Sequence, residues 1–155
     1  MQLVVFTLQE QHYALPLAAV ERVVRAAATT PLPGAPPVVL GVLDIAGEVL
    51  PVLSLRRRFG LPARAEPAVS DHFVIAHTGR RPVVLVVDEL VGVVERSDLA
   101  FTAASRIAPG MRQIAAAATL EGRLVLIEDL AQCLTAAEAE ALDTALAGAE
   151  PHDAW

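Results

Sequence analysis

The sequence is poor in the residues on which several classes of function depend. Cys133 is its single cysteine, so the chain carries no disulfide framework, and aromatic residues make up only 4% of its 155 positions. The chain has twelve arginines, no lysine, and 18 aspartates and glutamates, which gives a formal net charge of −6. Binding of nucleic acid requires a dominant basic stripe that displaces counterions from phosphate, so we expect no nucleic acid partner.

Long uninterrupted apolar runs are also missing, although hydrophobic residues make up 54% of the chain. Asp44, Glu48, Asp88 and Glu89 interrupt the longest apolar stretches before they reach the roughly 20 residues that a membrane-spanning helix needs. The first residues, MQLVVFTLQEQ, lack the basic start and small-residue cleavage site of a signal peptide. The sequence therefore predicts a cytoplasmic protein that does not insert into a membrane.

Motifs of catalysis and metal binding are absent from the sequence. It contains no Gly-x-Ser-x-Gly elbow, no phosphate-binding glycine loop and no His-Glu-x-x-His helix. His72 and His77 are five positions apart on one expected strand and so lie on opposite faces. Together with Asp71 they give the only enzyme hypothesis, and no reaction suggests itself. We expect no catalytic residue, no metal and no cofactor, with Cys133 as a small core residue.

Two kinds of charged cluster have simple structural interpretations. Asp88-Glu89 and Glu128-Asp129 each close an apolar strand, a position typical of solvated rims rather than of paired catalytic acids. The run Arg56-Arg57-Arg58 is predicted to be a solvated strand end, with a small electrostatic contact to an acidic partner as the alternative.

What the chain does contain is a series of short apolar strands separated by turns. The clearest pair, 39–45 and 49–55, flanks the turn Ala46-Gly47-Glu48. Pro51 interrupts the second of these strands, and because proline cannot donate to a central ladder we predict an edge position or a bulge there. The alternation of apolar residues and the turn residues predict further strands at 2–9, 12–15, 72–77, 82–87, 90–96, 113–120 and 123–127.

Two helices are expected beside these strands. Residues 17–24 have apolar side chains at helical spacing behind Pro16, which predicts a short helix. Thr135 and Glu138 form a capping box that opens a second helix over 136–147. Residues 148–155 are predicted to be a flexible tail.

Taken in order, these segments resemble the CheW-like family, the coupling proteins of bacterial chemotaxis arrays. The resemblance covers about residues 2 to 146. The stretches that carry it are Phe6-Thr7-Leu8, Tyr13 to Leu17, Val20 to Val24, Pro31-Leu32-Pro33, Gly41-Val42-Leu43, Leu50 to Pro62, Val86 to Val93 and Leu124 to Leu130.

The resemblance implies a mainly β fold of two small five-stranded β-barrels that share strands. Residues 1–147 would then form a single CheW-like domain, with one barrel over roughly 12–70 and the other over roughly 1–9 plus 71–130. It also implies a non-catalytic signalling adaptor of a two-component system. Such an adaptor couples the cytoplasmic tip of a chemoreceptor to the regulatory domain of a chemotaxis-type histidine kinase.

Carried over by position, the receptor-facing surface includes Val20, Arg22, Gly41 and the turn formed by Asp44, Ala46, Gly47 and Glu48. The kinase-facing surface is expected around the same turn and the second barrel. Gly41 is expected to permit a close backbone approach.

One motif departs from the family pattern. The family usually reads Asn-Leu-Arg-Gly where this chain reads Asp44-Ile45-Ala46-Gly47, which lowers the local charge by about two units. An anionic partner surface suited to the usual pattern would be repelled. An array that controls pili or another output is therefore an alternative to flagellar chemotaxis. A β-barrel that binds a small ligand in its interior or between the barrels is the alternative from another functional class.

Overall fold

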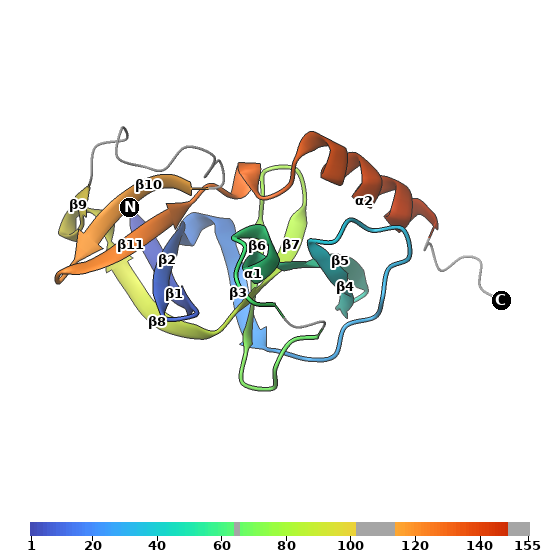
Figure 1. The fold of residues 1–155 in the computed structure, drawn as a ribbon, viewed down its shortest axis with the longest axis horizontal. Helices are drawn as coiled ribbons and strands as arrows, with labels where there is room; N and C mark the ends of the chain where they lie inside the picture. The colour runs from blue at the N-terminus through green and yellow to red at the C-terminus, as the bar shows by residue number, and fades with distance from the viewer. Residues whose placement is uncertain (64–65, 102–113, 149–155) are drawn as a thin grey trace.

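The computed structural model describes residues 1–63, 66–101 and 114–148, and its strands form two sheets (Figure 1). The first sheet has the strand order β8-β1-β2-β11-β10-β9, and the second has the order β3-β6-β7-β5-β4. The strands are β1 Gln2–Leu8, β2 Gln11–Pro16, β3 Val20–Arg25, β4 Val39–Ile45, β5 Glu48–Ser54, β6 His72–His77, β7 Pro82–Val87, β8 Glu89–Glu95, β9 Ala100–Phe101, β10 Ile114–Leu120 and β11 Arg123–Glu128. The predicted mainly β fold is confirmed.

Each sheet joins segments that are far apart in the sequence. A parallel pairing unites β2 with β11 in the first sheet, and another unites β5 with β7 in the second. The first sheet takes strands from 2–16 and 89–128 and the second from 20–87, while the division into barrels over 12–70 and 1–9 plus 71–130 stays a prediction. Strand β2 lies with β1 because the two form a tight hairpin, whereas β6 and β7 join β3, β4 and β5.

The predicted helix over 17–24 is wrong beyond its first turn. A 3-10 helix, η1, covers Leu17–Ala19, and the residues after it form β3, which pairs with β6. The apolar spacing in this segment fits a helix and a half-buried strand alike. The β-branched residues Val20, Val23 and Val24 favour the strand, because their stiff side chains pack well on a pleated surface.

A helical turn that the sequence analysis missed follows β5. Helix α1 covers Leu55–Arg58, and the hydroxyl of Ser54 caps it by accepting a hydrogen bond from the backbone N–H of Arg57. The three arginines therefore lie on a helix rather than at a strand end. Further 3-10 turns in the described part of the chain are η2 over Arg96–Asp98 and η4 over Leu130–Gln132.

The C-terminal helix and its capping box are confirmed. Helix α2 covers Ala136–Gly148. The Thr135 hydroxyl accepts a hydrogen bond from the Glu138 N–H at 3.1 Å, and the Glu138 carboxylate accepts one from the Thr135 N–H at 2.8 Å. The rest of the predicted tail, 149–155, lies outside the described residues.

Pro51 lies where β5 has a neighbour on one side only. It is opposite Val42 of β4, and the pairing of β5 with β7 starts one residue later, at Val52. Strand β5 is central in its sheet, so the predicted edge position holds for this residue but not for the strand. The missing N–H of proline thus leaves no ladder partner unsatisfied on the β7 side.

The hydrophobic core has three layers. One cluster lies on one face of the first sheet and includes Leu3, Val5 and Val125, and another lies on one face of the second and includes Val52 and Phe73. The largest cluster takes side chains from both sheets and from α2. It explains why β1 is buried on both faces. No helix in the described part of the chain is long and apolar enough to span a membrane.

Candidate partner-binding surface

The turn between β4 and β5 forms an exposed, well-defined tip. Ile45 pairs with Glu48, and the two residues between them, Ala46 and Gly47, both have positive φ angles, +53° and +87°. This geometry is that of a tight two-residue hairpin turn, for which asparagine, aspartate or glycine is preferred. The Asp44 carboxylate accepts a hydrogen bond from the Gly47 N–H at 2.9 Å. Asp44 therefore holds the turn in shape as well as giving it negative charge.

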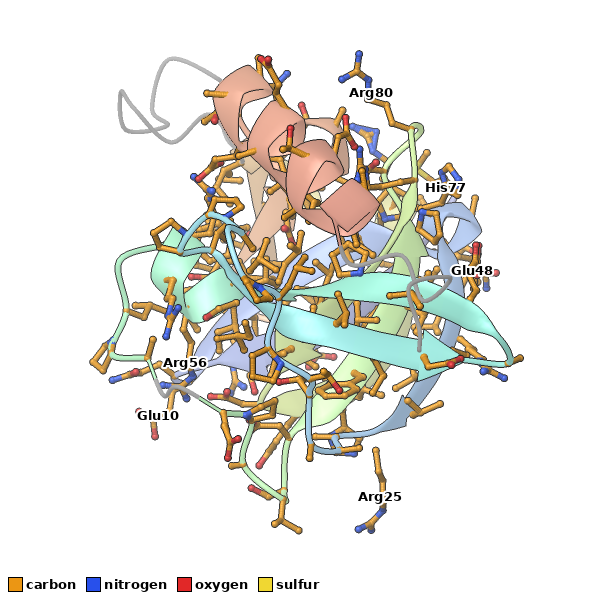
Figure 2. All side chains as sticks on the ribbon, turned by 90° about the vertical axis from the view of Figure 1, so that its right-hand side faces the viewer. Glu10, Arg25, Glu48, Arg56, His77 and Arg80 are labelled. Carbon is orange, nitrogen blue, oxygen red and sulfur yellow. The ribbon has the colours of Figure 1, made fainter. Side chains whose placement is uncertain are left out.

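The structure brings together only part of the predicted site. Asp44, Ala46, Gly47 and Glu48 lie at this hairpin tip and are all exposed. Glu48 and the exposed His77 point to the same side of the molecule, in the right half of Figure 2.

Two other predicted residues belong to a different strand from the tip. Val20 and Arg22 lie on β3, at the opposite end of the strand order from β4, where a bulge separates their positions. Val20 is half-buried and Arg22 is exposed. The β3 residues and the hairpin tip are therefore not hydrogen-bonded neighbours in the sheet, and whether they contact one partner stays a prediction.

Gly41 is buried, and the protein's own backbone explains it. A methyl group at this position would lie 2.4 Å from the carbonyl oxygen of Thr30 and 3.2 Å from the hydroxyl of Thr29. Thr30 and Val42 exchange two backbone hydrogen bonds, of 2.8 and 3.0 Å, directly beside it. The predicted close backbone approach is confirmed, and the approaching segment belongs to the same chain. Its contact with a receptor stays a prediction.

Strand β8 carries an exposed apolar surface that the sequence analysis missed. It is an edge strand of the first sheet, paired with β1 alone. Leu90, Val91 and Val93 are 36%, 52% and 52% exposed. The apolar residues at 90–96 predicted the strand correctly. They did not predict that its side chains are exposed, because a strand covered on both faces has a similar apolar composition. Apolar side chains on an open strand edge are typical of protein–protein contacts.

The three arginines of α1 are engaged within the protein. Arg56 binds the carboxylate of Asp88, Arg57 donates to the carbonyl of Pro37, and Arg58 pairs with Glu138 at the start of α2. These intramolecular contacts therefore do not favour the alternative that the three arginines contact an acidic partner. Their role is to fix α1 against both sheets and α2.

The pair of Arg56 and Asp88 fixes the joint between the two sheets. Asp88 is the single residue between β7 and β8 and accepts two hydrogen bonds from the guanidinium, of 3.2 and 2.6 Å. Its carboxylate also accepts the N–H of Gln9, and its own N–H donates to the carbonyl of Thr7. Bidentate arginine–carboxylate pairs are strong and geometrically specific. The two sheets are thereby held in one relative position, as a scaffold requires.

The other sequence candidates do not form a reactive site. His72 and His77 lie at opposite ends of β6, while Asp71 is buried and its carboxylate accepts a hydrogen bond from the Ala68 N–H. Cys133 is 2% exposed, as predicted, and burial raises the pKa of its thiol to about 12. Among residues 1–63, 66–101 and 114–148, no group of three or more histidines, cysteines and acidic residues is placed to hold a metal ion.

Glu128 contradicts the prediction of a solvated rim. Its residue exposure is 2%, and neither of its carboxyl oxygens has a hydrogen-bond partner. Burial, with a smaller contribution from the neighbouring charge of Asp129, raises its pKa to about 8. Asp129 itself caps η4 by accepting a hydrogen bond from the Ala131 N–H.

Comparisons with known proteins agree with this fold. A family model described as the CheW-like domain matches residues 2–138. The chain is 31% identical over 142 residues to a chemotaxis protein CheW from Rhizobium meliloti (strain 1021), covering 90% of this chain and 91% of that protein. It is 32% identical over 77 residues to a chemotaxis protein CheW from Helicobacter pylori, covering 50% of this chain and 47% of that protein.

A solved structure has the same fold. The crystal structure of the scaffolding protein TtCheW from Thermoanaerobacter tengcongensis superimposes with a TM-score of 0.74 at 22% sequence identity. The match covers 88% of this chain and 89% of that structure.

Proposed function

The chain belongs to the CheW-like family, whose members are scaffolding proteins of chemotaxis and not enzymes, and we propose that it links a chemoreceptor to a histidine kinase. The partners would be the cytoplasmic tip of the receptor and the regulatory domain of the kinase. The protein would then act at membrane-associated receptor arrays without entering the membrane. The family match over residues 2–138 is the observation that carries this proposal.

Two features of the structure support a scaffold with two contact areas. The hairpin tip at 44–48 and the apolar edge of β8 belong to different sheets. The network of Arg56, Asp88 and Gln9 fixes these sheets relative to each other. A rigid body that holds two partners at a set distance raises the effective concentration of each for the other.

The hairpin tip selects a partner by charge. Asp44 and Glu48 are both exposed there, and Ala46 contributes no cation. Opposite charges across an interface favour association, and like charges oppose it. We therefore expect the kinase domain that binds this chain to present basic groups opposite the tip, whereas the usual family pattern with arginine suits an acidic surface.

The first test measures binding of Ala46→Arg to the regulatory domain of a kinase whose usual adaptor carries the Asn-Leu-Arg-Gly motif. We expect tighter binding than for the unchanged chain, with a gain that shrinks at high salt because exposed charges are screened. Ala46→Gln is the control, since it adds a long side chain without charge. Equal affinity for all three proteins would show that the tip is not the kinase contact.

The second test addresses the edge of β8. Val91→Asp places a charge in the exposed apolar area, and Val69→Asp is a matched control because Val69 is 86% exposed in the connector before β6. We expect Val91→Asp to weaken capture of the receptor tip or of the kinase domain at least tenfold, while Val69→Asp leaves both unchanged. Unchanged capture of both partners by Val91→Asp would remove β8 from the proposed interface.

A further inference from the structure

Glu128 is an unusual residue for the place it occupies. It ends β11, opposite Ile114 of β10, and both oxygens of its carboxyl group are buried without a hydrogen-bond partner. An ionised carboxylate without a partner in an apolar environment costs several kcal/mol, whereas the neutral acid loses only its hydrogen bonds to water. The closed structure is therefore compatible with a protonated Glu128.

Among the residues that the structure describes, the charge that acts on the pKa of Glu128 is the negative charge of Asp129, while the positive charge of Arg58 acts on the nearby Cys133. Asp129 is its neighbour in the chain, Tyr13 faces it from β2, and Cys133 faces it from the end of η4. The negative field of Glu128 in turn adds to the burial that raises the pKa of Tyr13 and of Cys133. Burial and the charge of Asp129 favour the proton on Glu128, whereas Tyr13 and Cys133, whose own pKa values are raised, are uncharged near neutral pH.

The position of Glu128 connects the first sheet to the C-terminal segment, which we define as residues 129–148. This segment runs from the end of β11 through η4 to α2, across the top of the molecule in Figure 1. It contributes Leu130, Cys133 and Leu142 to the core cluster shared by the two sheets. Any displacement of the Glu128 carboxyl group therefore acts on the first residues of this segment.

A hollow beside Glu128 can accommodate the ionised side chain. It has a volume of about 490 Å³, opens to solvent between the first sheet and η4, and is lined by Glu128 together with apolar residues such as Leu3 and Ile127. The charged residues Arg96 and Asp129 also line it, as does Met1. A volume of this size holds several water molecules, which can hydrate a carboxylate. Rotation of the side chain into the hollow would satisfy its charge but would remove it from its present packing.

We propose that the protonation state of Glu128 controls the docking of the C-terminal segment. With the proton bound, the side chain stays buried and η4 and α2 remain packed on the shared core. When the proton is lost to water, the carboxylate turns into the hollow and the segment opens more often. This property is independent of the adaptor role proposed above.

Cys133 is a built-in probe for this opening. It is the only cysteine in the chain, lies in the C-terminal segment and is buried. Its rate of modification by a thiol reagent, divided by the rate for Glu128→Gln at the same pH, reports the opening caused by the charge, because the intrinsic thiol reactivity cancels. Glu128→Gln keeps the shape of the protonated acid and cannot ionise.

The pH dependence of this ratio follows from the two pKa values. The closed form has a pKa of about 8 and an exposed glutamate about 4.5, so opening releases a proton between these values. The ratio should rise about tenfold per pH unit from pH 6 towards pH 8 and level off above it. Stability is accordingly greatest at low pH and is lost as the pH rises through this window.

Two results would overturn the proposal. One is a ratio that stays constant between pH 6 and pH 9. The other is a Glu128→Leu variant, which fills the same space without a titratable group, that keeps the pH dependence of the unchanged chain. If Glu128→Gln does not fold, Glu128→Leu serves as the reference in its place. Binding of receptor and kinase at pH 6.5 tests the adaptor role separately. At this pH we expect the C-terminal segment to be docked in the unchanged chain, in Glu128→Gln and in Glu128→Leu.

Discussion

Gly41→Ala tests whether Gly41 serves the fold. The new methyl group would lie 2.4 Å from the Thr30 carbonyl oxygen, so the two backbones must separate by about 1 Å to reach an ordinary contact. This shift would weaken the two hydrogen bonds between Thr30 and Val42, each contributing about 0.5–1.5 kcal/mol. With about 1–3 kcal/mol for overpacking, we expect a loss of about 2–4 kcal/mol in the free energy of unfolding.

Urea unfolding followed by circular dichroism measures this loss, and each kcal/mol should also lower the Tm by about 2–4 °C. Gly47→Ala is the first control, because its φ of +87° costs about 1–2 kcal/mol but nothing lies within 4 Å of the new methyl group. Gly148→Ala is the second and should be nearly neutral. A Gly41→Ala protein as stable as Gly148→Ala would refute the steric argument and favour a direct role of Gly41 in partner binding.

Three further changes have expected outcomes in the same unfolding assay. Ala46→Asn should stabilise the protein by about 0.5–1 kcal/mol, because asparagine tolerates the positive φ of this turn better than alanine does. Asp88→Ala should cost about 2–3 kcal/mol by leaving Arg56 without its carboxylate, whereas loss of the exposed Glu95 should cost under about 1 kcal/mol. Burial acts to raise the pKa of Glu138, but hydrogen bonds and the charge of Arg58 outweigh it and lower the pKa. Glu138→Gln should therefore destabilise the protein at pH 7, and this loss should shrink as the pH falls through the lowered pKa of the native carboxylate; a loss that does not change with pH would contradict this reasoning.

The strands were predictable because their signals are local. Two apolar runs separated by a turn with a glycine at positive φ, such as Gly47 or Gly122, predict a hairpin from neighbouring residues alone. The capping box of Thr135 and Glu138 is equally local. The family resemblance supplied the order in which these pieces assemble into two halves.

The errors share a different cause, which is that burial depends on distant segments. Glu128 looked like a rim residue, but it is 2% exposed in the folded chain. The arginines of α1 looked available, but their partners Asp88 and Glu138 lie 32 and 80 positions away along the chain. The exposure of Val91 likewise depends on which strand takes the edge. The sequence around each of these residues does not determine its burial or its partner.

The parallel pairings of distant strands also set the order in which the chain can fold during synthesis. All strands of the second sheet lie between Val20 and Val87, so this sheet can assemble as soon as that stretch has left the ribosome. Strands β1 and β2 emerge first but must wait for β11, which ends at Glu128, before their sheet is complete. Pairings over such sequence separations form slowly because the loop must be closed first. Until β11 has been made, β2 therefore keeps an open strand edge at which premature association can occur.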